Sequence, residues 1–186
     1  MIRETKEVRI EVELRRGGEG TTVETPLPFL THMVETLLFY AGLDGVVRAI
    51  ELRQLDEGHH VIEDTALAVG AAIAELLGDR RSITRYGWAA VPMDDAFALA
   101  AVDLGGRPYW VVKAKLPRVT VGGYPAHMFK HFVRSLASAA GATIHIYAHG
   151  ADPHHVIEAA HKALGLALRQ AMEPSSRVMS TKGSVG

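Results

Sequence analysis

The chain has 186 residues, of which 48% are hydrophobic, and its formal net charge is −1 at pH 7. A chain of this length and composition can bury a substantial core, so we expect one compact unit. The balanced charge gives no electrostatic reason to expect nucleic acid as a partner. The sequence contains no cysteine, which excludes disulfide bonds and thiolate metal ligands.

The N-terminal region does not have the composition of a targeting segment. Residues 1–10 carry five charged side chains, and the chain contains no apolar run of the length that a membrane span requires. We therefore expect neither secretion nor membrane insertion, and we predict that the protein is cytoplasmic.

The first half of the chain opens with a strand pattern. Alternating apolar residues predict strands at residues 8–14 and 22–25, on either side of a glycine-rich turn at residues 15–20. We interpret this pair as a β-hairpin. A helix containing His32, an alternating strand at 46–52 and a buried helix from Glu63 to residue 77 then follow.

The second half repeats this order. Strands are predicted at residues 97–104 and 109–116, again interpreted as a hairpin with a glycine turn at 105–108. A helix containing His131, a strand at 143–147 and a long helix at 153–172 complete the half. Asp152 is a candidate N-cap for the last helix, because Pro153 suits the first helical turn.

The clearest sign of duplication is the pentapeptide His-His-Val-Ile-Glu, which occurs at residues 59–63 and again at 154–158. Each copy is followed seven residues after its glutamate by a glycine, Gly70 and Gly165. Agreement over so many positions predicts an internal repeat. We therefore divide the chain into two halves, residues 1–86 and 87–186, which share one core.

The pentapeptide has the residue types of a metal site. In a helix, the glutamate lies four residues after the first histidine and three after the second, so either histidine can share its face. The two histidines diverge by about 100° around the helix, which makes it difficult for both to bind one ion. We therefore expect each copy to contribute to two metals.

Together with the matching histidines of the two halves, this predicts eight metal ligands, four for each of two ions: His32, His59, His60, Glu63, His131, His154, His155 and Glu158. Nitrogen and carboxylate ligands without sulfur suit Mn²⁺, Zn²⁺, Fe²⁺ or Ni²⁺. A six-coordinate ion such as Mn²⁺ keeps positions open for a substrate, which favours a catalytic role over a structural one.

Several further stretches carry a family resemblance that runs essentially from end to end and in order. The chain resembles imidazoleglycerol-phosphate dehydratase in Pro28-Phe-Leu-Thr-His-Met33, His59-His-Val-Ile-Glu-Asp-Thr65, Arg85-Tyr-Gly87, Val91-Pro-Met-Asp94, Asp103-Leu-Gly-Gly-Arg-Pro-Tyr109, His154-His-Val-Ile-Glu158 and Ser180-Thr-Lys-Gly183. The doubled His-His-Val-Ile-Glu pentapeptide, which we call the histidine cassette, together with the terminal Ser-Thr-Lys-Gly makes the resemblance highly specific.

The resemblance implies an α+β fold of duplicated half-domains, ribosomal protein S5 domain 2-like, with helices packed between two four-stranded sheets. It also implies a cubic homo-oligomer, a 24-mer, with paired Mn²⁺ ions, two per site, at the subunit contacts. Its partners would be a small-molecule phosphate substrate and further copies of the chain, with neither nucleic acid nor membrane.

The implied reaction is the dehydration of D-erythro-imidazole-glycerol phosphate to imidazole-acetol phosphate in histidine biosynthesis. No strong electron acceptor sits beside the C–H bond that must lose its proton, so direct removal faces a high barrier. Two metals, one on each ring nitrogen, would stabilise an imidazolate that expels the adjacent hydroxyl. A carboxylate then removes the neighbouring proton, and the resulting enol relaxes to the ketone.

The resemblance also implies roles for residues outside the metal set. Glu7 and Glu158 are the acid/base candidates, and Asp94 is a candidate for contact with the substrate. Phosphate would be bound by five side chains that supply cationic or hydroxyl donors: Arg85, Arg107, Lys162, Ser180 and Lys182. Several positions depart from the usual family pattern, among them Thr31 where aspartate is usual and Thr36 where glutamine is frequent.

Two other classes of function remain open from the sequence. One is a different dinuclear metalloenzyme, such as a phosphoester hydrolase, and the other is a non-catalytic metal-binding or storage protein. Neither class accounts for the phosphate residues and the C-terminal motif together, so we favour the dehydratase.

Overall fold

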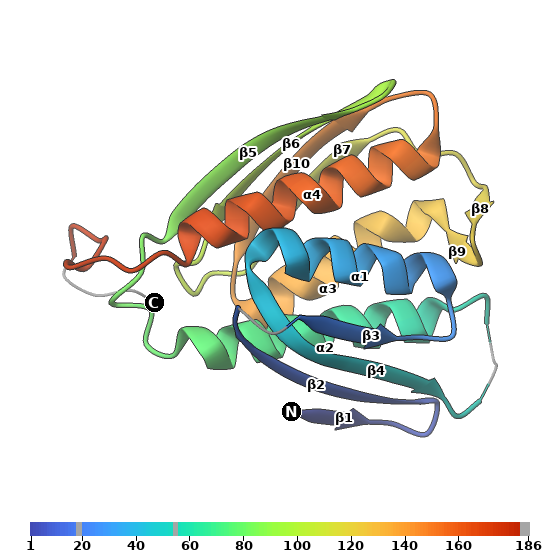
Figure 1. The fold of residues 1–186 in the computed structure, drawn as a ribbon, viewed down its shortest axis with the longest axis horizontal. Helices are drawn as coiled ribbons and strands as arrows, with labels where there is room; N and C mark the ends of the chain where they lie inside the picture. The colour runs from blue at the N-terminus through green and yellow to red at the C-terminus, as the bar shows by residue number, and fades with distance from the viewer. Residues whose placement is uncertain (18–19, 54–55, 183–186) are drawn as a thin grey trace.

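The computed structural model describes residues 1–17, 20–53 and 56–182. Four long helices lie between two four-stranded sheets (Figure 1), as the predicted α+β architecture requires. The first half contains β1 (Ile2–Glu4), β2 (Val8–Arg16), β3 (Thr21–Glu24), α1 (Pro28–Ala41), β4 (Leu43–Glu51) and α2 (His59–Leu77). The second half contains β5 (Tyr86–Met93), β6 (Ala96–Asp103), β7 (Tyr109–Ala114), the short strands β8 (Thr120–Val121) and β9 (Tyr124–Pro125), a 3₁₀ turn (Ala126–Met128), α3 (Phe129–Ala140), β10 (Thr143–His149) and α4 (Pro153–Ala171).

The order of the main elements is the same in both halves when β8, β9 and the 3₁₀ turn are set aside: three strands, a helix, a strand and a helix. We propose that the halves are two fused copies of one unit, with the division at residue 86, where β5 begins.

The two predicted hairpins are wrong in their pairing. In the first sheet the strand order is β1-β2-β4-β3, so β4 lies between the two strands that we expected to pair. The second sheet has the order β5-β6-β10-β7, with β10 in the same intermediate place. In each half the third strand runs parallel to the inserted strand, and a helix makes the crossover between them. A glycine-rich connection between two strands does not show whether a later strand enters between them.

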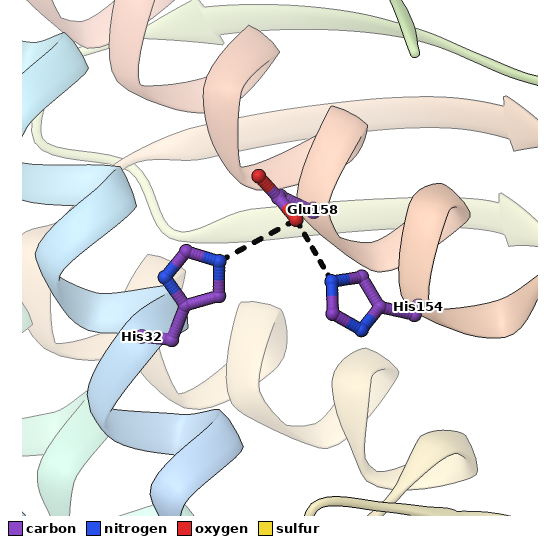
Figure 2. A group of neighbouring side chains, drawn as sticks. All are labelled: His32, His154 and Glu158. Atoms are coloured by element: carbon purple, nitrogen blue, oxygen red, sulfur yellow. Dashed lines mark hydrogen bonds and ion pairs between the residues drawn. The ribbon is translucent and has the colours of Figure 1, made fainter. Parts of the chain in front are cut away.

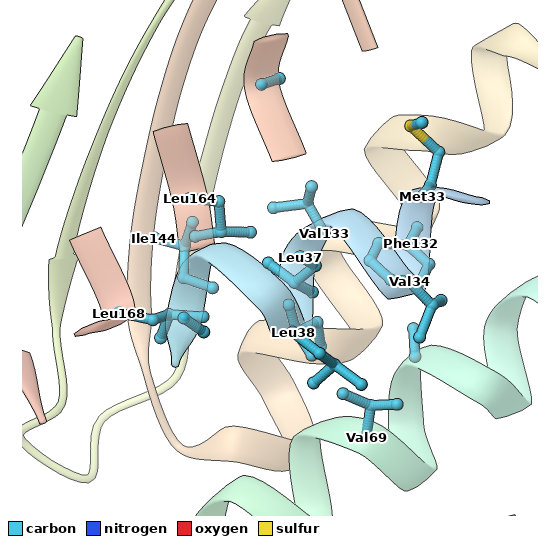
Figure 3. Close-up of a cluster of buried hydrophobic side chains, with 14 of the residues drawn as sticks. Met33, Val34, Leu37, Leu38, Val69, Phe132, Val133, Ile144, Leu164 and Leu168 are labelled. Atoms are coloured by element: carbon cyan, nitrogen blue, oxygen red, sulfur yellow. The ribbon is translucent and has the colours of Figure 1, made fainter. Parts of the chain in front are cut away.

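The core is shared by the two halves. Alternate residues of the strands point inward, as Val8, Ile10 and Val12 do in β2, and are buried. Figure 3 shows Leu37 and Leu38 of α1 among apolar side chains of α2, α3 and α4. Burial of this contiguous apolar surface is the main source of stability and fixes the helices relative to one another.

The repeated glycines noted in the sequence lie where helices cross. A Cβ atom at Gly70 of α2 would lie 2.6 Å from the Leu136 carbonyl oxygen of α3. At Gly165 of α4 a Cβ atom would lie 2.7 Å from the Leu37 carbonyl oxygen of α1. Both distances are too short for real contacts, so the missing side chain lets each helix pair approach closely. The two crossings set the positions of the helix ends that carry the histidine cassettes.

The predicted helix starts are confirmed for α4 and extended for α2. Asp152 caps α4, since its carboxylate accepts a hydrogen bond from the His154 amide at 2.8 Å. Helix α2 begins at His59 and not at Glu63, so the whole first cassette is helical. Among the described residues, no helix is both long and apolar enough to cross a membrane.

Candidate metal centres and anion pocket

The first candidate metal centre joins α1 to α4. Figure 2 shows His32 of α1 facing His154 and Glu158 of α4. The Oε2 atom of Glu158 lies 3.4 Å from Nε2 of His32 and 3.0 Å from Nε2 of His154. The three ligand atoms lie within 4.8 Å of one another, which is the separation expected for ligands of one ion.

The second candidate metal centre joins α2 to α3 and has the same composition. The Oε2 atom of Glu63 lies 3.3 Å from Nε2 of His59 and 3.2 Å from Nε2 of His131. Each centre therefore combines the first histidine and the glutamate of one cassette, four residues apart, with a histidine from the other half of the chain.

The carboxylates of both centres are held in the ionised form. Burial raises the pKa of Glu63, but the imidazoles of His131 and His59 outweigh burial, so the net shift is downward. Burial likewise raises the pKa of Glu158, and the ammonium of Lys162 with the imidazoles of His154 and His32 turns the net shift downward. Ionised carboxylates are the form that binds a cation.

The donor sets fit a divalent transition metal. Each centre offers two imidazole nitrogens and one carboxylate oxygen, which are suitable ligands for Mn²⁺, Fe²⁺, Ni²⁺ or Zn²⁺. Three ligands leave positions free on a six-coordinate ion. The Nε2 atom of His131 is buried and has no hydrogen-bond partner among the described residues, although Glu63 lies near it. A buried nitrogen without a hydrogen bond is costly, and a metal at this position would satisfy it.

The second histidine of each cassette points away from these two centres. The Nε2 atom of His60 lies 3.1 Å from Oε2 of Glu7 and 3.4 Å from Oδ2 of Asp56. In the other half, the Nδ1 atom of His155 lies 2.7 Å from Oδ1 of Asp95. The divergence expected from helix geometry is therefore present, and the structure does not bring His60 or His155 into either group of three.

Two aspartates that the sequence did not single out orient these second histidines. Asp95 lies in the turn between β5 and β6, and its other oxygen accepts hydrogen bonds from the amides of Ala151 and Asp152. Its hydrogen bond to His155 lowers the pKa of Asp95 far below the usual range and raises the pKa of the imidazole. No local pattern predicts a contact across 60 residues.

Asp56 lies just before the first histidine pair and contacts the start of α2. Its Oδ1 atom accepts a hydrogen bond of 2.7 Å from the amide of His59, which closes the start of α2. Asp56 lies two residues before the N-cap, Gly58, so its contact is with the first amide of the helix and is not a side-chain N-cap. The other oxygen of this carboxylate lies 3.4 Å from Nε2 of His60, so Asp56 contacts the backbone of the first histidine and the ring of the second.

Of the three predicted catalytic carboxylates, Glu7 and Asp94 lie beside the outward-facing histidines and Glu158 lies in a metal centre. Glu7, in the turn between β1 and β2, touches His60, while Asp94, in the matching turn of the second half, lies 3.6 Å from His155. Glu158 belongs to the first metal centre. Each half therefore sets a carboxylate from its first turn beside the outward-facing histidine.

A separate pocket gathers four of the five predicted phosphate residues. It has a volume of about 430 Å³ and is lined by Arg85, Tyr86, Gly105, Arg107, Met179, Ser180, Thr181 and Lys182. Two guanidinium groups, one ammonium and a hydroxyl are donors that suit a phosphate dianion. Gly183, the last residue of the predicted terminal motif, lies outside the described residues.

The fifth residue, Lys162, lies elsewhere. Its Nζ atom is 2.9 Å from Oε1 of Glu158, and it lines a second cavity with His32 and Thr36. The departure at Thr36 thus faces the first metal centre and not the anion pocket.

Thr31, the other departure named above, accepts a hydrogen bond of 3.2 Å from the Thr25 amide. Nε2 of His32 lies 3.4 Å from Glu158, so a carboxylate of α4 lies beside this ring although position 31 carries a threonine.

Two solved structures share this architecture. The dehydratase from Pyrococcus furiosus superposes with a TM-score of 0.84 at 38% identity and covers all of both chains. The dehydratase from Staphylococcus aureus gives a TM-score of 0.81 at 30% identity, with 94% of this chain and 98% of the other covered.

Sequence comparison gives the same result. The chain is 71% identical over 184 residues to the imidazoleglycerol-phosphate dehydratase of Pyrobaculum arsenaticum, covering 99% of this chain and 98% of the relative. A bifunctional histidine-biosynthesis protein from Legionella pneumophila is 44% identical, with 97% of this chain matched to 51% of that protein. The family model described as imidazoleglycerol-phosphate dehydratase matches residues 25–168. The chain therefore belongs to the imidazoleglycerol-phosphate dehydratase family, the hydro-lyases of histidine biosynthesis.

Proposed function

We propose that this dehydratase acts on D-erythro-imidazole-glycerol phosphate with two Mn²⁺ ions at each site. The observation that carries the proposal is the matched pair of three-ligand groups, His32 with His154 and Glu158, and His59 with His131 and Glu63. Two groups of equal chemistry fit a substrate whose ring offers two nitrogens. When bound, the ions would supply positive charge to the imidazole ring, which would stabilise its imidazolate form and favour loss of the hydroxyl on the carbon beside the ring.

We further propose that the site is completed between copies of the chain. His60 and His155 are held by carboxylates on faces that turn away from the two groups of three. A neighbouring copy can present such an outward histidine as the fourth protein ligand. A closed homo-oligomer of 24 subunits would supply these contacts to every copy.

The chemistry assigned to the side chains is proton transfer and orientation. The substrate loses a hydroxyl from the carbon beside the ring and a hydrogen from the next carbon, and the enol that results becomes the ketone. Both oxygens of Glu158 are engaged, one by the two imidazoles and one by Lys162. The Glu7 side chain is 34% exposed and, within the described part of the chain, its carboxylate lies 3.1 Å from Nε2 of His60, so we assign the proton transfer to Glu7.

The phosphate is assigned to the anion pocket. Arg85, Arg107 and Lys182 bring three positive charges to one cavity, and Ser180 adds a hydroxyl. Arg85 contacts Ala171 at the C-terminal end of α4, whereas His154 and Glu158 lie near its N-terminal end, so we assign this pocket to a substrate held at the metal centres of a neighbouring copy. Binding of this non-reacting end would orient the reacting end of the substrate. Asp94 and Lys162 are assigned to contacts with the glycerol portion.

The test is turnover of the stated substrate. Protein stripped with a chelator, and the same protein reloaded with Mn²⁺, are incubated with imidazole-glycerol phosphate, and imidazole-acetol phosphate is quantified. We expect product only after reloading. Equal turnover by the stripped protein overturns the metal requirement, and release of inorganic phosphate without the ketone indicates a hydrolase.

Two variants separate the carboxylate roles. Glu7→Gln should retain bound metal and lose turnover, whereas Glu158→Gln should lose metal as well as turnover. Loss of metal from Glu7→Gln would move Glu7 into the ligand set. Size-exclusion chromatography of stripped and reloaded protein shows whether metal also stabilises the oligomer, and an unchanged large species would show that packing alone suffices.

A further inference from the structure

Arg85 is held by a carboxylate that has no assigned role. The guanidinium Nε atom donates to Oδ1 of Asp103 at 2.6 Å, and Nη2 donates to Oδ2 at 3.0 Å. Parallel bonds of this kind fix the plane of the guanidinium as well as its position. Arg85 is 8% exposed and the Asp103 side chain 17%, so water screens the pair weakly.

The remaining edge of the same guanidinium reaches the C-terminal segment. The Nη1 atom of Arg85 donates to the Met179 carbonyl at 2.9 Å, immediately before Ser180. A guanidinium has five N–H donors, and three are used in these bonds. Arg85 can therefore bind the segment that lines the pocket and still offer N–H groups to an anion inside it.

The backbone around the pair is shaped to accommodate it. A Cβ atom at Gly105 would lie 2.6 Å from Nη2 of Arg85 and 2.8 Å from Oδ1 of Asp103. Arg85 itself adopts a left-handed conformation with φ of 73°, which is unfavourable for a residue with a side chain. Its amide donates to Ala171 and its carbonyl accepts from Leu104, so the surrounding structure maintains the strained geometry.

We propose that Asp103 is a positioning residue for phosphate binding: it aims Arg85 into the anion pocket and, through Arg85, holds the segment from Met179 to Lys182 against it. This inference rests on the proposed function of the pocket. Asp103 places a negative charge beside a site for an anion, and charge alone would weaken binding there. If Asp103 positions Arg85, removal of its charge should weaken phosphate binding. If its charge acts only by repelling the anion, the same change should strengthen phosphate binding.

The experiment compares Asp103→Asn with wild type, Arg85→Ala and the double variant, all loaded with Mn²⁺. For Asp103→Asn we expect KM for imidazole-glycerol phosphate and the dissociation constant of inorganic phosphate to rise about tenfold or more, the loss expected for charged hydrogen bonds, with little change in kcat. Because Asp103 acts through Arg85, the double variant should be no worse than Arg85→Ala. Tighter phosphate binding by Asp103→Asn, or additive losses in the double variant, overturns the proposal.

Gly105→Ala provides a second route that leaves every charge in place. The added methyl group displaces the guanidinium, so we expect the same rise in the phosphate dissociation constant and faster amide exchange at residues 180–182. Unchanged phosphate affinity in Gly105→Ala overturns the proposal even where Asp103→Asn does not fold. Glu24→Gln is the matched control, because it removes one carboxylate from the exposed pair with Arg48 on the other sheet.

Direct phosphate binding also separates this inference from the proposed function. It is measured by calorimetry without turnover, so failure of wild type to dehydrate the substrate would reject the function and leave the comparison of phosphate affinities intact. Normal turnover with no dependence of phosphate affinity on Asp103 would reject only the positioning role.

Discussion

The two metal centres differ at one equivalent position, and this difference predicts unequal metal affinity. Four residues after Glu158 comes Lys162, whose ammonium lies 2.9 Å from Oε1 of that carboxylate. Four residues after Glu63 comes Leu67, which is uncharged. A metal bound at the His32 centre would therefore lie near a positive charge that has no counterpart at position 67. We predict that the His59 centre is the tighter one.

The size of the effect follows from Coulomb's law. A divalent ion and an ammonium roughly 5 Å apart repel by about 2 kcal/mol in water and by about 7 kcal/mol at an effective dielectric constant of 20. The Lys162 side chain is 21% exposed, which places the site between these limits. Even the lower value corresponds to more than a tenfold change in affinity, because 1.4 kcal/mol is a factor of about ten.

The assay is a titration with Mn²⁺ in which binding is measured by calorimetry and by electron paramagnetic resonance. Neither method depends on turnover. Lys162→Leu should strengthen the weaker class of sites about tenfold or more, so that the two classes converge. Leu67→Lys, the reciprocal change, should weaken the tighter class. Binding isotherms that are identical for wild type and both variants would refute the electrostatic reasoning.

Three further outcomes concern stability. Burial lowers the pKa of His161 to about 4, so between pH 6.5 and 4 the unfolded chain binds a proton at this imidazole that the folded protein does not. The free energy of unfolding should therefore fall by about 3 kcal/mol over this range, and denaturant unfolding of His161→Leu should lack this dependence on pH. Gly165→Ala should lower the unfolding free energy by about 1–3 kcal/mol, since its Cβ atom meets the Leu37 carbonyl, and an unchanged melting temperature would contradict that contact. Mn²⁺ at a hundred times its dissociation constant should add about 2.7 kcal/mol to the unfolding free energy per site, a gain that calorimetric melting should find reduced in His131→Ala.

Much of the fold could be predicted because its signals are local. Periodicity located the helices, and the doubled pentapeptide led us to expect the same order of elements in the two halves. Strand pairing was not local: β4 enters between β2 and β3 only because α1 carries the chain back across the sheet. Residue alternation describes which face of a strand is buried and contains no information about its neighbour.

The candidate site divides along the same line. The first histidine and the glutamate of each cassette were predicted to share a face, because four residues make about one helical turn. The separation of Lys162 from the other phosphate candidates was not predicted. Its role in phosphate binding was implied only by the resemblance, and in the structure its ammonium pairs with Glu158. Asp95 was missed because its contact with His155 joins segments distant in the sequence.

The proposed duplication would account for the equal composition of the two candidate metal centres, and the differences between the halves would make the site asymmetric. Each half contributes the same three ligand types and a turn carboxylate beside its outward histidine. The ammonium of Lys162 lies on one centre only. The anion pocket is likewise built from residues of one half together with Arg85, the residue before β5. In the proposed site, two equivalent ions alone would accept an imidazole ring in two orientations, and a cationic pocket supplied by a neighbouring copy would select the orientation that places the glycerol carbons beside Glu7.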